Sequence, residues 1–279
     1  MPLTVTVLVE NRSLRDDLLA GRGLSLHLQA DEHSVLFDTG PDERLITNAE
    51  RLGIDLSRVS TIVLSHGHYD HSGGLPALAA WFARRSLRPQ LVAHPAAFLS
   101  RGILLPLRRR AQPWRQLGSP MDQTALAKHF TLTLSDTPLP LPGRLCFLGQ
   151  VPRRTGIPGG KSLGAKLTAQ GWRRDEVADD SGLVWQGDDG LVVLSGCAHA
   201  GICNLTEQAR QVGGVSQPVQ AVLGGFHLRS SGPGDLWQVR GYFRQLGAAR
   251  VGACHCSGWG RHWLPGQSDI STGSQLQFQ

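Results

Sequence analysis

Histidine and aspartate gather in the six-residue run 66–71, His-Gly-His-Tyr-Asp-His, and these residue types bind metal ions. His66 and His68 project to the same side of an extended segment, so both imidazoles can reach one ion. Asp70 and His71 follow too closely to complete the same tetrahedron and are better placed to serve a second ion. The spacing predicts a two-metal hydrolytic centre in which bridging water becomes hydroxide near neutral pH. His68 and Asp70 are its predicted catalytic residues.

A surface loop that contains several histidines by chance is the alternative explanation of this run. The chain has 11 histidines in 279 residues. Three of them and an aspartate within six positions favour a functional origin, whereas a single histidine elsewhere is ordinary.

Three further histidines each follow an apolar stretch in the second half of the chain: His199, His227 and His255. Ends of neighbouring strands converge on one rim of a sheet, where open α/β folds build their sites. We expect these side chains to meet the 66–71 run there. His227 is predicted to contact substrate, with a structural role as the alternative. His94, at the end of another predicted strand, is a second candidate for substrate contact.

Apolar runs that alternate with helical patterns predict a layered α/β architecture in a single domain over residues 1–279. A loop-rich insertion is expected at about 96–162, where Pro, Gly and Arg are frequent and loops can cover or select the substrate. Strands are predicted at 3–9, 24–28, 34–37, 61–64, 91–93, 130–134, 145–148, 183–185, 191–194, 219–223 and 250–253. Helices are predicted at 42–52, 75–85, 202–212 and 235–246.

The composition of the chain limits the cellular compartment in which the protein is expected. Hydrophobic residues make up 41% of the chain, which suffices for a substantial core, and no stretch of 18 apolar residues predicts a membrane span. The first residues alternate like a strand and lack the order of a secretion signal. Five cysteines form an odd count without close CxxC pairs, which favours a reducing compartment. A cytoplasmic location is therefore expected.

The formal charge of +6 limits the class of partner. Its basic residues cluster at 84–88, 108–110, 153–154 and 173–174. Such clusters suit a small anionic substrate, such as a phosphate ester, or nucleic acid, and they also suit a solvated arginine-rich surface. Their scatter argues against a nucleic-acid partner, and the absence of a long apolar stretch argues against a membrane partner. The oligomeric state stays open, and a homo-oligomer is compatible with the sequence.

The spacing in the 66–71 run, together with Phe37-Asp38-Thr39-Gly40 upstream, resembles the metallo-β-lactamase superfamily. Further phrases resemble one branch of it, which includes the archaeal dihydropterin–ribofuranosylaminobenzene-phosphate synthases and many bacterial hydrolases. These phrases begin at Gly21, Gly196, Gly224 and His255.

The resemblance implies a four-layer αβ/βα sandwich with a dinuclear metal site along one edge. It implies that His66 and His68 bind the first ion, which His199 completes. It assigns Asp70 and His71 to the second ion, which His255 completes. It also implies that Asp38 is buried behind the metal ligands and props the histidine loop without touching metal.

One departure from the family pattern concerns a bridging ligand. Many members carry a bridging aspartate on a second-half loop, but the loop 196–199 has none. Two residues are candidates for the missing ligand: Cys197 on this loop, and Asp180 just before the predicted strand 183–185. Two divalent ions are expected, with zinc first and iron or manganese as alternatives.

These residues predict a hydrolase that uses metal-activated hydroxide on a small, anionic ester or phosphoester. The alternative is a pterin-type condensing enzyme that uses the same ions to stabilise an anionic intermediate. A nuclease on the same scaffold is a third hypothesis, and a non-catalytic sensor is the fourth. No GxSxG turn or Walker phosphate loop points to another nucleophile or cofactor.

Overall fold

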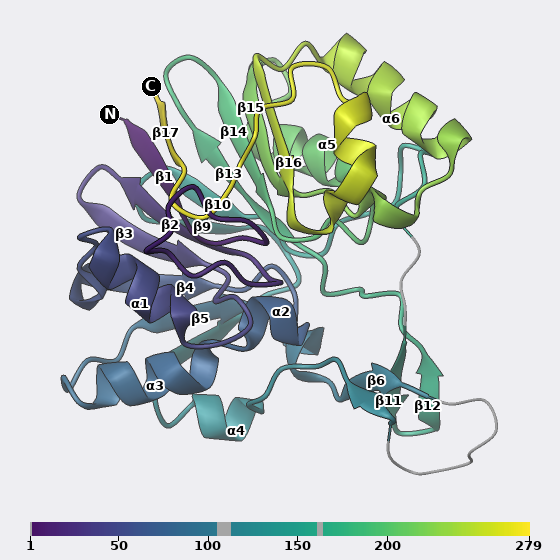
Figure 1. Ribbon diagram of the computed structural model, residues 1–279. Helices are drawn as coiled ribbons and strands as arrows, with labels where there is room; N and C mark the ends of the chain where they lie inside the picture. Colours follow the sequence, from purple (N-terminus) through teal and green to yellow (C-terminus); the bar gives the residue numbers. More distant parts are fainter. Residues whose placement is uncertain (1, 105–112, 161–163) are drawn as a thin grey trace.

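Two β-sheets lie face to face at the centre of the computed structural model, which describes residues 2–104, 113–160 and 164–279 (Figure 1). The first sheet has seven strands in the order β17-β1-β2-β3-β4-β5-β8. Their bounds are Gln275–Phe278, Leu3–Val9, Ser25–Ala30, His33–Phe37, Val59–Val63, Gln90–Ala93 and Thr131–Leu134. The second sheet has six strands in the order β16-β15-β14-β13-β10-β9. Their bounds are Arg250–Cys254, Val219–Gly225, Leu191–Ser195, Gly182–Gln186, Leu145–Phe147 and Leu139–Leu141.

Helices cover the outer side of each sheet. The first sheet is covered by α1 (Arg44–Arg51) and α3 (Leu75–Ala83), and the second by α5 (Ile202–Gly213) and α6 (Pro233–Leu246). The remaining helical segments are short: α2 Tyr69–Ser72, α4 Gln123–Leu126, and the 3-10 turns η1 Leu56–Arg58, η2 Pro95–Phe98, η3 Leu228–Ser230 and η4 His255–Trp263. None of the described helices is long and apolar enough to cross a bilayer.

Three apolar clusters account for the layers. The central one joins the inner faces of both sheets and contains the buried rings of Phe37, Phe147 and Trp185. A second cluster fills the space between the second sheet and its helices, and a third does the same for the first sheet. A sheet or helix that hides one apolar face needs such a partner layer. The predicted four-layer αβ/βα sandwich is confirmed.

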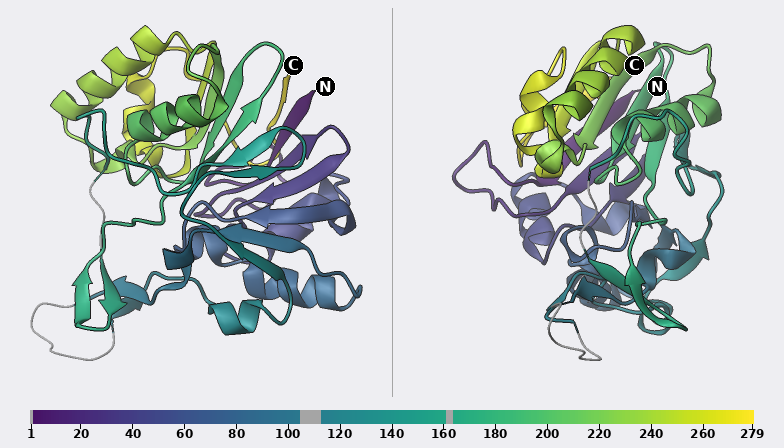
Figure 2. Two further views of the ribbon diagram at one scale, coloured as in Figure 1. Left: turned by 180° about the vertical axis from the view of Figure 1, so that it is seen from behind. Right: turned by 90° about the vertical axis from the view of Figure 1, so that its right-hand side faces the viewer.

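A third, small sheet stands apart from this body (Figure 2). Its order is β12-β11-β6-β7, with bounds Gly171–Arg174, Ala165–Thr168, Arg101–Ile103 and Arg115–Gln116. The region expected to be loop-rich, 96–162, contributes strands to all three sheets. The basic cluster 108–110 lies outside the described residues.

Most predicted elements match the structure to within a few residues, including the hairpin of β13 and β14 and the long helices. The sequence did not reveal β17, which pairs antiparallel with β1 and brings the two ends of the chain together. It also did not reveal β6, β7, β11 and β12. These strands have two to four residues and carry several charged side chains, so their periodicity is too short to detect.

Parallel pairing positions the chemistry at one edge. Strand β4 pairs parallel with β3 and β5, and it ends just before the 66–71 run. Strands β14, β15 and β16 also run parallel, and the loops after them carry His199, His227 and His255. The carboxyl ends of both sets of strands therefore face the same cleft edge, as the sequence predicted.

Candidate metal centre

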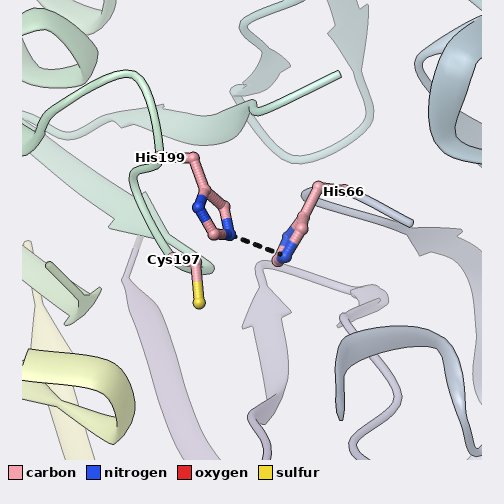
Figure 3. A group of neighbouring side chains, drawn as sticks. All are labelled: His66, Cys197 and His199. Atoms are coloured by element: carbon pink, nitrogen blue, oxygen red, sulfur yellow. Dashed lines mark hydrogen bonds between the residues drawn. The ribbon is translucent and has the colours of Figure 1, made fainter. Parts of the chain in front are cut away.

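Three imidazoles meet at a first point. The Nε2 atom of His66 lies 2.9 Å from Nδ1 of His68 and 3.3 Å from Nε2 of His199. Figure 3 shows His66 and His199 reaching toward one another from separate loops, with the Cys197 sulfur beside them. His66 is completely buried and His199 is 5% exposed. The two halves of the chain thus supply one compact nitrogen cluster.

A second group lies next to the first. Nε2 of His71 is 3.2 Å from Nε2 of His255, and Oδ2 of Asp70 is 3.4 Å from the same His255 nitrogen. The Cys197 sulfur is also 3.2 Å from His71 Nε2. Asp70 is within ligand range of His66 and His68 as well, so it can serve either group.

These spacings fit metal binding. Around a tetrahedral Zn²⁺ with bonds of about 2.0–2.1 Å, neighbouring nitrogen ligands lie about 3.3 Å apart. Burial holds the pKa of His66 and His199 well below the usual value and lowers that of His68 to about 4. Neutral rings keep a lone pair for an ion, which is the form that binds metal. Several lone pairs directed at one point call for a cation between them.

The second group contains an ionised carboxylate. Burial by itself would raise the pKa of Asp70, but His71, His255 and His68 together hold it well below the usual range. Burial also opposes charge on His71, yet the carboxylates of Asp38 and Asp70 raise its pKa to about 9. The carboxylate of Asp70 is therefore ionised and available as a ligand.

Asp38 lies directly behind the ligands. Its two oxygens accept hydrogen bonds from the Ser65 amide and hydroxyl and from Nδ1 of His71, each at 2.7 Å. The Ser65 oxygen is also 2.9 Å from Nδ1 of His66, so that nitrogen carries the ring proton and donates it. Both Nε2 atoms are thereby left free to face the ions, as the predicted supporting role of Asp38 requires.

The sequence profile of the Metallo-beta-lactamase superfamily matches residues 20–154, which include Asp38 and the whole 66–71 run. A solved structure, Tm1679, described as a metal-dependent hydrolase of the beta-lactamase superfamily, is 26% identical with a TM-score of 0.82. The alignment covers 98% of each chain.

Residues 20–154 match the metallo-β-lactamase superfamily, and the chain as a whole has the fold of that superfamily.

Two curated relatives come from Methanocaldococcus jannaschii. One is named 7,8-dihydropterin-6-methyl-4-(beta-D-ribofuranosyl)-aminobenzene-5'-phosphate synthase and is 27% identical over 249 residues, which is 85% of this chain and 81% of the relative. The other is an uncharacterized protein, 26% identical over 257 residues and 91% of each chain. Both similarities extend beyond the first half, and they agree with the branch that the motifs suggested.

Two close backbone approaches bring the superfamily ligands together. A Cβ at Gly67 would overlap the carbonyl oxygen of Ala97, so the histidine run can lie against η2 only with glycine there. A Cβ at Gly196 would overlap the hydroxyl of Ser65 and approach Asp38. Gly196 therefore allows the loop after β14 of the second sheet to pack against Ser65 and Asp38, which support the histidine run of the first sheet.

Three residues on the second-half loops of this chain have a strained backbone. Ala198, His227 and His255 all have positive φ, between 51° and 52°. Non-glycine residues in this region cost energy and are held there by surrounding structure. The His255 amide donates to Oε1 of Glu10 at 2.8 Å, which fixes its loop against β1. Glu10 has no sequence signal because it lies 245 positions from His255.

Arg101 and Asp179 also support the histidine run, and sequence analysis missed both. The guanidinium of Arg101 contacts Asp179 and lies 2.6 Å from Asp175, and all three side chains are at most 2% exposed. Asp179 accepts a hydrogen bond from the Gly67 amide at 2.8 Å. The third sheet is thereby connected to the metal-binding loop. The pair Asp179-Asp180 was the only available hint.

Asp180 is not brought into either group. Its Oδ2 accepts from the Ala200 amide at 2.8 Å, and it belongs to none of the ligand clusters among the described residues. Burial raises its pKa to about 7, because nearby backbone donors offset only part of the cost of charge. Asp180 holds the His199 loop here, and metal binding by it stays a prediction.

The two predicted substrate-contact histidines occupy different positions. The ring of His227 lies 4.3 Å from that of His199, beside the first group. His94 is 7% exposed, and its Nδ1 accepts from the Ala96 amide at the start of η2. His227 is thus placed next to the centre, whereas His94 is a buried capping residue of a neighbouring turn.

A pocket of about 270 Å³ opens beside His199. Arg153 and Arg174 line it together with Gly159, Gly160, Asp175 and Glu176. Asp175 is already paired with Arg101, and the exposed Glu176 opposes one of the two exposed arginines, so an incoming anion would meet a small excess of positive charge.

Proposed function

We propose that this protein is a metal-dependent hydrolase that acts on a small anionic ester or phosphoester through a dinuclear centre. The observation that supports it is the convergence of five buried or half-buried imidazoles and Asp70 at spacings suited to metal ligation. Zinc is the proposed ion, with iron or manganese as alternatives, because imidazole and carboxylate suit all three.

Each residue has a defined task in this proposal. His66, His68 and His199 hold one ion, and His71, His255 and Asp70 hold the other. When bound, the ions supply a hydroxide nucleophile by lowering the pKa of water to about 7. The carboxylate of Asp70 has two oxygens, so one can ligate while the other accepts a hydrogen bond from the nucleophile and orients it. His227 contacts the substrate next to His199.

Arg153 and Arg174 account for the proposed preference for anions. They line the pocket at His199, so a phosphate or carboxylate there would have its other end at the centre. Guanidinium groups form strong, charge-assisted hydrogen bonds with such oxyanions.

The test combines element analysis of the purified protein with a panel of phosphoesters and lactones. We expect about two divalent ions per chain and turnover of an anionic substrate. His68→Ala should lose metal and turnover, whereas His129→Ala, at a half-buried histidine outside both groups, should keep them. Full turnover by His68→Ala would refute the assignment.

A condensing enzyme of the pterin type is the second candidate, and a different pocket favours it. This pocket, of about 440 Å³, is lined by His255, by Trp259 at 83% exposure, and by three arginines, Arg12, Arg229 and Arg261. An exposed indole suits a flat aromatic ring, and arginines suit a diphosphate. The curated relative named as a synthase agrees with such a substrate.

Incubation with a pterin diphosphate and an aminobenzene acceptor separates the two candidates. Release of pyrophosphate with a new carbon–nitrogen or carbon–carbon bond would support condensation, and Trp259→Ala should weaken it. Hydrolysis of simple esters without pyrophosphate release would support the first candidate.

The remaining proposals concern the setting. We propose a cytoplasmic protein, on the basis of the odd cysteine count, whose partner is a small anionic molecule. Neither membrane nor nucleic acid is a proposed partner, and a homo-oligomer is compatible with the chain. Salt-dependent binding to RNA or single-stranded DNA would contradict the exclusion of nucleic acid as a partner.

A further inference from the structure

The two ligand groups lack a shared anionic atom from the loops of the second sheet. The family pattern places a bridging aspartate there, but loop 196–199 contains none. Asp180 accepts from the Ala200 amide through Oδ2, and it lies in none of the ligand clusters among the described residues. Two divalent ions so close together repel each other unless an anion lies between them.

On the described loops after the strands of the second sheet, Cys197 is the residue that shares a ligand cluster with imidazoles of both groups. Its sulfur, with the ligand atoms of His66 and His199, forms a cluster in which all atoms lie within 4.8 Å of one another. The same sulfur forms a second such cluster with His71 and His255, and it lies 3.2 Å from His71 Nε2. Figure 3 shows Cys197 on the same loop as His199 and near His66.

The surroundings of Cys197 suit a ligand. The residue is 3% exposed, so water cannot easily replace the sulfur. Thiolates bind Zn²⁺ at about 2.3 Å, and a thiol that coordinates metal loses its proton. A thiolate has more than one lone pair and can therefore bond two ions. With Asp70, it would bring two negative charges to two imidazole groups that are otherwise neutral or cationic.

Cys256 is the competing sulfur. Its sulfur accepts from the His227 amide at 3.2 Å and lies within 4.8 Å of the Cys197 sulfur. Among the described residues, however, Cys256 shares a ligand cluster only with Cys197 and His227, so it does not reach both imidazole groups. Position therefore favours Cys197.

We propose that the Cys197 sulfur bridges the two metal ions, in the place that a carboxylate takes in many members of the superfamily. This inference rests on the dinuclear centre of the proposed function, but it concerns ligation and not the substrate.

X-ray absorption of the zinc-loaded wild-type protein tests the proposal directly. A bridge gives an average of about one sulfur per zinc at about 2.3 Å, next to nitrogen and oxygen at about 2.0–2.1 Å. A sulfur bound to only one of two ions gives about half of that average, and absence of sulfur gives none. Either of the last two results would overturn the bridge, and neither requires a variant to fold.

Variants identify the sulfur. Cys197→Ser should lose the sulfur signal and, in the cobalt-loaded protein, the near-ultraviolet band of thiolate-to-cobalt charge transfer. Cys203→Ala is the matched control, because Cys203 is 1% exposed on α5 and belongs to no ligand cluster among the described residues. It should keep both signals. Loss of them in Cys256→Ala, with retention in Cys197→Ser, would assign the sulfur to Cys256 and overturn the proposal.

The outcomes for ligation and for function are separable. A sulfur bridge in a protein that hydrolyses none of the panel would sustain the ligand and contradict the hydrolase. Hydrolysis by a two-zinc protein without a sulfur ligand would support the hydrolase and contradict the sulfur bridge.

Discussion

Nδ1 of His71 donates a hydrogen bond to Oδ2 of Asp38 at 2.7 Å, and both side chains are completely buried. The same carboxylate also accepts from Ser65, which lies against His66. One acid therefore sets the ring orientation of a histidine in each ligand group. A substitution of Asp38 is therefore expected to weaken metal binding by both ligand groups.

Asp38→Asn should reduce metal affinity by roughly 10–100-fold, because the amide accepts fewer hydrogen bonds and brings no charge to His71. Competition against a chelator of known affinity measures the change. Asp42→Asn is the matched control, since Asp42 is a half-buried acid paired with Arg44 and lies outside both ligand groups. Unchanged affinity in Asp38→Asn would contradict the supporting role.

Gly67→Ala should destabilise the fold by about 1–3 kcal/mol and displace the histidine run, because the new methyl group overlaps the Ala97 carbonyl. Urea unfolding and bound-metal content are the two measurements. Gly241→Ala in α6 has open space around the new methyl group and should be neutral or slightly stabilising. Equal stability of the two variants would show that the loop adapts freely.

Arg101→Met should cost about 3–5 kcal/mol, because it leaves the buried carboxylates of Asp175 and Asp179 without their partner. Metal affinity should fall as well, since Asp179 holds the Gly67 amide. The exposed pair of Arg144 and Asp188 offers the comparison, and Arg144→Met should change stability by about 0–1 kcal/mol. A small loss in Arg101→Met would mean that water reaches this pair.

His27 should make stability depend on pH. Burial lowers its pKa to about 4, whereas an unfolded histidine titrates near 6.5. Between these values the unfolded chain binds the extra proton, so stability falls as pH decreases from about 6.5 to 4, by about 3 kcal/mol from this group. Unfolding in urea with chelator present, which removes effects of metal loss, should show a shallower decline for His27→Gln. An identical decline would exclude His27 as the cause.

Arg174→Ala should raise KM for an anionic ester by roughly 10–100-fold, because a charge-assisted hydrogen bond contributes about 1.5–3 kcal/mol. Arg173→Ala is the neighbouring control, since Arg173 does not line the pocket at His199. Steady-state kinetics with the anionic ester and an uncharged analogue separates charge from shape. Equal effects on both esters would argue against an anion contact.

The sequence alone determined the layered α/β class, the main strands and helices, and the importance of the 66–71 run. It could do so because strands such as β1 and β14 and helix α5 carry their periodicity locally, and because the spacing of His66, His68, Asp70 and His71 limits how they can ligate. The positions of His199 and His255 after strands also pointed to one sheet edge.

Tertiary structure alone decided how the ligands are divided and supported. Whether Asp180 or Cys197 faces the imidazoles depends on which way the loop before β13 and the loop after β14 direct their side chains. The contacts of Glu10 with His255 and of Arg101 with Asp179 join residues far apart in the chain. Such pairings arise when whole layers pack together, so local sequence patterns do not predict them.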